Sequence, residues 1–145
     1  MVVALGSNLG NRRYNLLRAV HTLGEVIRVV RVSSIHETEP VDAPPPRFLN
    51  MVISGYTTLD PEALMEALLD IEARLGRVRT RRNAPRVIDI DLILYGARRV
   101  RTNALTLPHP RARERAFVME PLAEVWSAVA LLPLSHRAER GFAAS

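Results

Sequence analysis

The sequence predicts an α+β fold in which a largely antiparallel sheet is flanked by helices. Three observations support this prediction: short segments rich in β-branched residues, two segments with apolar residues at helical spacing, and turn-forming residues between them. The expected elements are, in order, a strand at 1–5, a helix at 12–23, strands at 27–35 and 48–57, a helix at 61–75 and a strand at 88–94. This order is typical of a ferredoxin-like βαββαβ core.

The first helix has recognisable ends. Asn11 is a suitable N-cap, because its side-chain oxygen can accept a hydrogen bond from an unpaired N–H of the first turn. Leu16, Val20 and Leu23 share one face, and Gly24 is expected to end the helix.

Two strands surround a proline-rich segment. Residues 27–35 are rich in β-branched side chains, which favour a strand. Prolines within 39–46 exclude a helix there and favour extended backbone. In the strand that follows, Phe48 and Asn50 lie two residues apart and therefore face the same way.

The second helix begins with a strong signal, in which Asp60 is a cap and Pro61 occupies the first helical position. Gly76 is expected to end it. The core-facing positions are Leu64, Leu68, Ile71 and Leu75. A third helix is expected within 113–125, where Pro121 weakens it.

Composition limits the possible class of protein. At 145 residues, with 48% hydrophobic and 24% charged residues, we expect one globular domain, 1–145. The absence of cysteine excludes disulfides and thiolate metal sites, which leaves ligands suited to hard cations. No signal peptide and no apolar run of ~20 residues is present, so a soluble cytoplasmic protein is expected.

The chain is basic, with a formal net charge of +5. Its twenty basic residues are all arginine. Such a charge favours anionic partners, either nucleic acid or a polyphosphate, and the distribution of the arginines must decide between them.

The most informative feature is the pair Asp89 and Asp91. In a strand the two side chains point the same way, with backbones roughly 6.6 Å apart. The opposite face is expected to be apolar, formed by Ile88, Ile90, Leu92 and Leu94. Two converging carboxylates can hold one or two magnesium ions. The alternative is a pair of aspartates on a solvated face, paired with nearby arginines.

Six arginines lie shortly before Asp89: Arg74, Arg77, Arg79, Arg81, Arg82 and Arg86. The planar guanidinium binds phosphate oxygens through two parallel hydrogen bonds, so cations beside an acid pair suit a triphosphate that carries magnesium. An isolated run of this kind is more often a solvated basic loop. Its direct continuation into the acid pair favours the phosphate interpretation.

Other polar positions give weaker signals. Glu72 lies near the C-terminal end of its helix, where the helix dipole disfavours an anion, so a ligand or a salt bridge to Arg77 or Arg79 is expected. The turn at 6–10 lacks the lysine and hydroxyl pair of a P-loop and is interpreted as structural. His109 lies in a loop fixed by prolines and is a weak candidate on its own.

Together these segments resemble the 6-hydroxymethyl-7,8-dihydropterin pyrophosphokinases of folate biosynthesis. The similarity runs from Ala4 to about Glu124, and the most specific part is the segment 82–93. The supporting segments are 37–40, 48–50, 71–72, 76–79, 107–109 and 115–117.

The resemblance implies a ferredoxin-like enzyme that transfers the β,γ-diphosphate of ATP to the pterin hydroxymethyl group and releases AMP. It implies two magnesium ions held by Asp89 and Asp91, with Arg77 and Arg86 also in the catalytic site. The implied ATP contacts are Glu72, Arg77, Arg79, Arg86, Leu92, Thr106, His109 and Arg115. The implied pterin contacts are Thr38, Val41, Phe48, Asn50, Asp89 and Phe117. Either aspartate could accept the hydroxyl proton.

The chain departs from the family pattern at two positions. Asn83 stands where many members carry tryptophan, and Pro110 replaces a tyrosine found in some members. These changes are expected to affect ligand affinity rather than the type of reaction. The loops 39–47 and 77–87 are expected to close over ATP and exclude water.

The rival interpretation is a nucleic-acid-binding module, because ferredoxin-like sheets with basic surfaces often bind RNA. Such a module needs stacking aromatics, which make up only 5% of this chain. It also leaves unexplained an acid pair that would repel a phosphate backbone. We therefore expect small-molecule substrates, no nucleic-acid or membrane partner, and a monomer or weak dimer.

Overall fold

The computed structural model of the protein describes residues 1–38, 47–77 and 86–130, with side chains as far as 125. Its strands are β1 (Val2–Ser7), β2 (Arg28–Val32), β3 (His36–Thr38), β4 (Phe48–Tyr56), β5 (Asp89–Leu94), β6 (Val100–Arg101) and β7 (Thr106–Leu107). Its helices are α1 (Arg12–Leu23), α2 (Pro61–Arg74) and α3 (Ala116–Ala130), and a 3₁₀ turn covers Ala112–Glu114.

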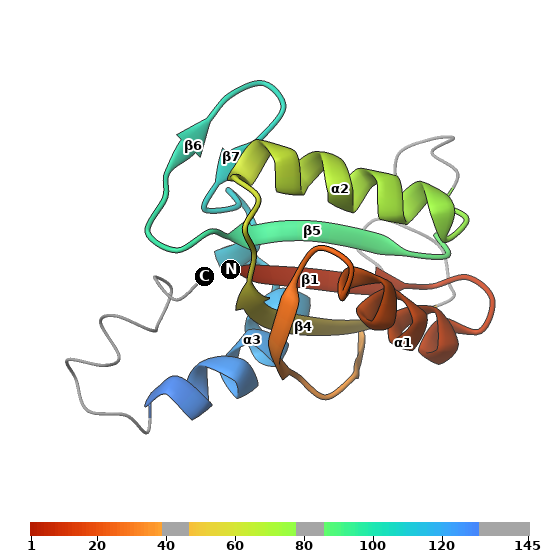
Figure 1. The fold of residues 1–145 in the computed structure, drawn as a ribbon. Coiled ribbons are helices and arrows are strands. Elements are labelled where there is room, and N and C mark those ends of the chain that lie inside the picture. Colours follow the sequence, from red (N-terminus) through yellow and green to blue (C-terminus); the bar gives the residue numbers. More distant parts are fainter. Residues whose placement is uncertain (39–46, 78–85, 131–145) are drawn as a thin grey trace.

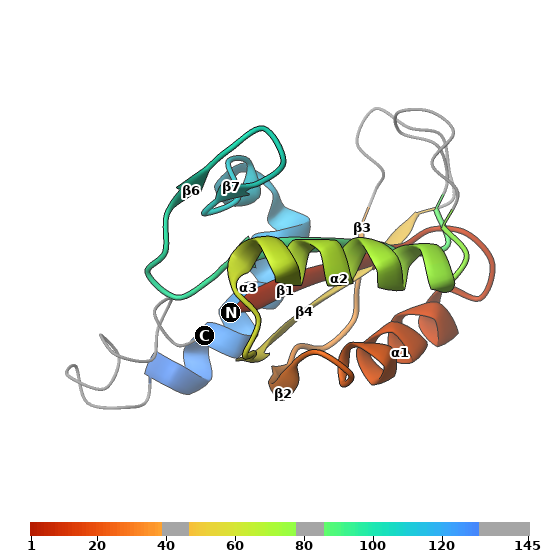
Figure 2. The ribbon, with the colours of Figure 1, turned by 45° about the horizontal axis from the view of Figure 1, so that its top comes forward.

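The main sheet has the order β2-β4-β1-β5, with β3 also paired to β4, and every pair is antiparallel. Helices α1 and α2 cover one face of the sheet, and α3 lies on the other (Figure 1; Figure 2). The α+β, ferredoxin-like prediction is confirmed. The short β6–β7 hairpin was not predicted.

Strand alternation divides the core between the two faces. Val3 and Leu5 of β1 pack with the buried residues of α1 and α2, whereas Val2 packs with Val118 and Leu122 of α3. Because helices cover both faces of the sheet, a polar side chain is partly enclosed even on β5, which lies at the edge of the sheet. This is the setting of the acid pair.

The segment predicted as one strand at 27–35 contains only β2, which ends at Val32, and the short strand β3, at 36–38, follows it and was not predicted. The buried residue Ser33 separates them, and its hydroxyl accepts a hydrogen bond from the Val52 N–H at 2.8 Å. A side-chain oxygen thus takes the position of a backbone acceptor, and the regular ladder is interrupted there. The single-strand prediction was wrong at this point.

The predicted apolar face of β5 is correct for Ile88, Ile90 and Leu92 but wrong for Leu94, which packs on the α3 side. The register explains the difference: Val3 pairs with Leu92, but Val2 pairs with Leu94, so Ile93 is an extra residue. A β-bulge of this kind turns the following side chain to the other face.

The helix ends follow the sequence signals. Asn11 caps α1 by accepting a hydrogen bond from the Tyr14 N–H at 3.1 Å, and Asp60 caps α2 in the same way. Gly76, just beyond α2, has φ +101°, which glycine adopts without steric cost. The third helix begins at Ala116 rather than 113, because a 3₁₀ turn precedes it, and it contains Pro121.

In the described part of the chain, no helix is both long enough and apolar enough to cross a membrane.

Candidate active site

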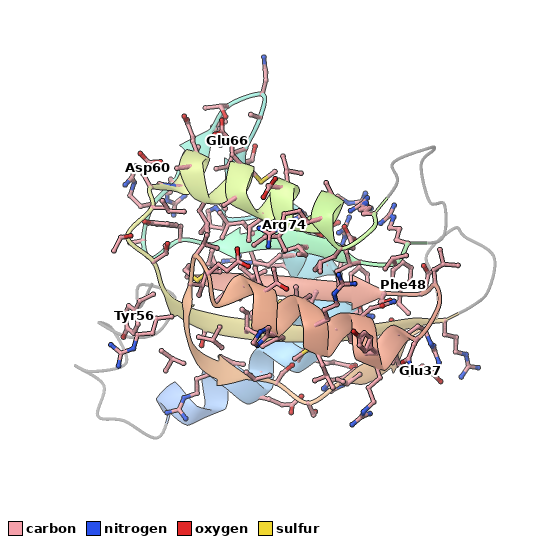
Figure 3. All side chains as sticks on the ribbon, turned by 45° about the vertical axis from the view of Figure 1, so that its right-hand side comes forward. Glu37, Phe48, Tyr56, Asp60, Glu66 and Arg74 are labelled. Atoms are coloured by element: carbon pink, nitrogen blue, oxygen red, sulfur yellow. The ribbon has the colours of Figure 1, made fainter. Side chains whose placement is uncertain are left out.

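The candidate site lies on the α3 face of the sheet, at the end of β1 where the chain leaves the strand. Gly6 of β1 pairs with Asn50 on one side and with Asp89 on the other. A Cβ at Gly6 would lie 2.9 Å from Asn50 Oδ1 and 3.4 Å from a Phe48 ring carbon. The glycine therefore lets the Asn50 and Phe48 side chains lie over the sheet between β4 and β5. Figure 3 shows Phe48 and Glu37 at this end of the sheet.

Asp89 lies between two arginines. Arg77 Nη1 is 2.5 Å from Asp89 Oδ1, and Arg86 Nη1 donates to Asp89 Oδ2 at 3.1 Å. The Asp89 side chain is 21% exposed. The structure thus places Asp89 in direct contact with two of the arginines that were predicted to bind phosphate.

Asp91 is the more enclosed member of the pair. Burial, followed by the charges of Asp89 and Glu72, raises the pKa of Asp91 to about 7, although Arg115 and Arg77 act in the opposite direction. Three carboxylates in this small region therefore repel one another, and added positive charge would stabilise their ionised forms.

The donor set fits magnesium. Asp89 and Asp91 offer only carboxylate oxygens, which are ligands that this ion prefers. Among the described residues, no group of three or more histidine or acidic side chains could hold a metal. The protein would therefore supply two ligands and leave the other positions to phosphate oxygens and water, as is usual for magnesium at phosphate-transfer sites.

Glu72 is 2% exposed, and its carboxylate accepts hydrogen bonds at the edge of the sheet. Its Oε2 accepts from Arg77 Nη1 at 3.0 Å and from the Ile90 N–H at 2.6 Å. Because β5 is an edge strand, this carboxylate takes the place of a neighbouring strand's carbonyl. Of the two arginine partners that the sequence left open for Glu72, the structure shows Arg77.

Arg77 joins the two carboxylates, since the same nitrogen contacts Glu72 and Asp89. Its side chain is 8% exposed, and its Nε is buried without a hydrogen-bond partner among the described residues. An unsatisfied buried donor is costly, so a ligand oxygen that reached this nitrogen would remove that cost.

The predicted pterin residues on β3 and β4 lie together. Asn50 is buried, and its Nδ2 donates to Thr38 Oγ1 at 2.6 Å. Phe48 pairs with Thr38 across the two strands. Phe117 comes from the start of α3, is half-buried, and has the Arg115 guanidinium 5.5 Å from its ring centroid.

The remaining predicted ATP residues are more scattered. The Leu92 side chain is buried on the α1 and α2 side, opposite the acid pair. Thr106 lies on β7 and is half-buried. The His109 N–H donates to Ile93 O at 2.8 Å, and burial, then the charge of Arg115, lowers the pKa of His109. His109 is therefore neutral at neutral pH and can accept or donate a hydrogen bond.

Two predicted site residues, Arg79 and Val41, lie outside the described residues, as does Asn83. Most of the two loops that were expected to close over ATP lies there as well. Pro110 is described and is exposed.

One residue beside the site was not singled out from the sequence. Asn8 is buried in the turn after β1 and hydrogen-bonds to the backbone of Arg86. The signal that could have indicated it is an asparagine inside a turn between a strand and a helix, where its side chain can bond to backbone groups.

Comparison with known proteins supports one family. The family model of the 7,8-dihydro-6-hydroxymethylpterin-pyrophosphokinases matches residues 2–127. The chain belongs to this family. It is 44% identical over 126 residues to the 2-amino-4-hydroxy-6-hydroxymethyldihydropteridine pyrophosphokinase of Bacillus subtilis, a match that covers 85% of this chain and 75% of that protein.

Other members of the family show the same relationship. Identity is 47% over 126 residues to the enzyme of the same name from Methylorubrum extorquens, covering 85% of this chain and 80% of that protein. Identity is 41% over 128 residues to a folate synthesis bifunctional protein of Arabidopsis thaliana. That match covers 86% of this chain but only 26% of the plant protein.

Proposed function

We propose that the protein transfers the β,γ-diphosphate of ATP to the hydroxymethyl group of 6-hydroxymethyl-7,8-dihydropterin, a step of folate biosynthesis. The observation that carries the proposal is the contact of Asp89 with both Arg77 and Arg86, next to Gly6, over which the Asn50 and Phe48 side chains lie. Membership of the family, together with the names of the relatives, supports the choice of substrates.

The reaction consists of one displacement. The hydroxyl oxygen of the pterin attacks the β-phosphorus, a new O–P bond forms, the bond from the β-phosphorus to the α,β-bridging oxygen breaks, and AMP leaves with that oxygen. The hydroxyl proton is lost at the same time. No covalent enzyme intermediate is needed, so the protein contributes position and charge.

The acid pair and the arginines have complementary roles in this proposal. Asp89 and Asp91 would hold magnesium, which neutralises phosphate charge when bound. Arg77 and Arg86 are already at the site, and their guanidinium groups would bind the phosphate oxygens. Asp91 is the first candidate to take the hydroxyl proton, and Asp89 is the second.

The pterin ring would lie over the floor formed at Gly6. Phe48 and Phe117 offer aromatic faces to a flat heteroaromatic ring. Asn50 offers an amide donor and acceptor to the ring edge, and its hydrogen bond to Thr38 fixes the orientation of the amide group. This arrangement explains why the floor needs a glycine.

The test is a set of assays with ATP, 6-hydroxymethyl-7,8-dihydropterin and increasing magnesium. We expect the wild-type protein to form AMP only when magnesium is present. Asp89→Asn and Asp91→Asn should each lower kcat/KM by about 100-fold or more, as expected when a preorganised electrostatic group is lost.

The matched control is Asp70→Asn, because Asp70 lies on α2 with its side chain 66% exposed. This variant should retain wild-type kinetics. Circular dichroism and urea unfolding of all variants separate loss of chemistry from loss of fold. Full activity in either Asp89→Asn or Asp91→Asn would contradict the assignment of the acid pair.

A further inference from the structure

We propose that Asn8 is a positioning residue that fixes the backbone of Arg86 beside the acid pair. Asn8 Oδ1 accepts a hydrogen bond from the Arg86 N–H at 2.7 Å, and the Asn8 N–H donates to Arg86 O at 3.0 Å. Both backbone polar groups of Arg86 are therefore held by one residue that lies 78 positions earlier in the chain.

The turn that carries Asn8 is itself held in place. Asn8 is 1% exposed and Ser7 is fully buried. From the first turns of α1, Asn15 Nδ2 donates to Leu9 O at 2.9 Å and to Ser7 Oγ at 3.2 Å. The residues on both sides of Asn8 are therefore bonded to α1, Leu9 through its backbone carbonyl and Ser7 through its side chain, and this holds Asn8 in place beside Arg86.

The position of Arg86 matters because its side chain reaches the acid pair. Arg86 Nη1 donates to Asp89 Oδ2 at 3.1 Å from a residue only three positions earlier. Because its N–H and C=O are held, the backbone of Arg86 has a defined position. Less conformational freedom is therefore lost when the Arg86 side chain binds a phosphate.

This arrangement gives the turn at 6–10 a role that differs from that of a phosphate-binding loop. The oxygen of the Asn8 side chain is directed at the protein's own backbone, where it accepts from Arg86. The turn thus contributes to the proposed phosphate site by holding the backbone of Arg86. The inference rests on the proposed function for its kinetic part, but its structural part can be tested without any substrate.

The structural test is amide hydrogen exchange at Arg86, measured by NMR in the protein without ligands. In Asn8→Ala the Arg86 N–H loses its acceptor, and its exchange should become about tenfold faster or more, the factor expected for one lost hydrogen bond in a buried setting. Asn8→Asp retains an acceptor oxygen at the same position and should keep the protection. Asn103→Ala, at an exposed asparagine, is the matched control.

The kinetic test is a double-mutant cycle with Arg86→Ala. Asn8→Ala should lower kcat/KM for ATP by about tenfold, and Asn8→Asp should restore most of it. Because Asn8 acts through Arg86, Asn8→Ala should have little further effect when Arg86 is already alanine.

Unchanged exchange at Arg86 in Asn8→Ala would overturn the proposal, and so would equal losses of kcat/KM in both backgrounds of the cycle. If Asn8→Ala does not fold, the test uses Asn8→Asp alone. A folded Asn8→Asp protein that lost both the exchange protection of the Arg86 N–H and the activity would also overturn the proposal. A wild-type protein without transferase activity would instead refute the proposed function, while the exchange result would still test the contact.

Discussion

Replacing Glu72 by alanine should strongly destabilise the protein, because it breaks a buried ionic network. The Glu72 carboxylate accepts from the Ile90 N–H at 2.6 Å and from Arg77 Nη1 at 3.0 Å. The substitution leaves an edge-strand N–H without its acceptor and removes one of the carboxylates that the buried Arg77 contacts, while the contact with Asp89 remains.

The size of the effect follows from these two losses. An unsatisfied buried N–H costs about 1–3 kcal/mol, and removing one partner of a buried ion pair costs about 3–5 kcal/mol. The two costs overlap because one oxygen serves both donors, so we expect Glu72→Ala to lose about 3–5 kcal/mol. Glu72→Gln can retain an acceptor for Ile90 and should lose about 1–3 kcal/mol.

The assay is urea unfolding at neutral pH, followed by circular dichroism and analysed with a common slope. A loss of about 4 kcal/mol moves the midpoint by about 2 M when the slope is about 2 kcal/mol per M. The matched control is Glu66→Ala on the same helix, where the side chain points away from the sheet (Figure 3). If Glu72→Ala were no less stable than Glu66→Ala, the network would not stabilise the fold and the reasoning would be refuted.

Three further predictions concern the floor of the site, the contact between α3 and the sheet, and a helix cap. Gly6→Ala should raise the KM for the pterin about tenfold with little change in the KM for ATP, because the new Cβ would displace Asn50 Oδ1, 2.9 Å away; equal effects on both KM values would contradict this. Hydrogen bonds from the Ser34 hydroxyl, from His36 and from the Ser34 N–H lower the pKa of Glu124 from 4.5 to about 2, so its contribution to stability is present above pH 4.5 and is lost as the pH falls towards about 2. Urea unfolding of Glu124→Gln should therefore show a weaker loss of stability across that range than wild type, and an unchanged pH profile would refute the assignment. Asn11→Ala should lower the free energy of unfolding by about 1 kcal/mol through loss of the α1 cap, whereas an unchanged urea midpoint would show that the cap contributes nothing.

The elements with local causes could be predicted from the sequence. Asn11 and Asp60 mark the starts of α1 and α2 because each cap bonds to an N–H three residues away. The end of β2 at Val32, before the predicted end at 35, could not be predicted in this way. It depends on the bond between the Ser33 hydroxyl and Val52, which lies on another strand.

The same distinction between local causes and contacts with distant residues applies to the candidate site. Strand alternation was enough to place Asp89 and Asp91 on one face, because that pattern belongs to the strand itself. For the salt-bridge partner of Glu72, the sequence left Arg77 and Arg79 open. The packing of α2 against β5 was needed to identify Arg77 as a partner. Asn8 could not be linked to Arg86, because the turn and the arginine are brought together only by the pairing of β1 with β5.

The position of Leu94 shows another feature of the fold that could not be predicted from the sequence. Simple alternation placed it with Ile90 and Leu92, but the extra residue Ile93 turns it to the α3 side. A bulge depends on the register between two strands, and the sequence of one strand does not contain that information.

The most direct test of the account is to identify the products by ³¹P NMR after reaction of the wild-type protein with ATP, magnesium and 6-hydroxymethyl-7,8-dihydropterin. The account predicts one AMP for each pterin diphosphate formed, with no ADP, and no reaction after magnesium is removed by a chelator. Formation of ADP and a pterin monophosphate would contradict diphosphate transfer, even if the acid pair and the arginines proved essential.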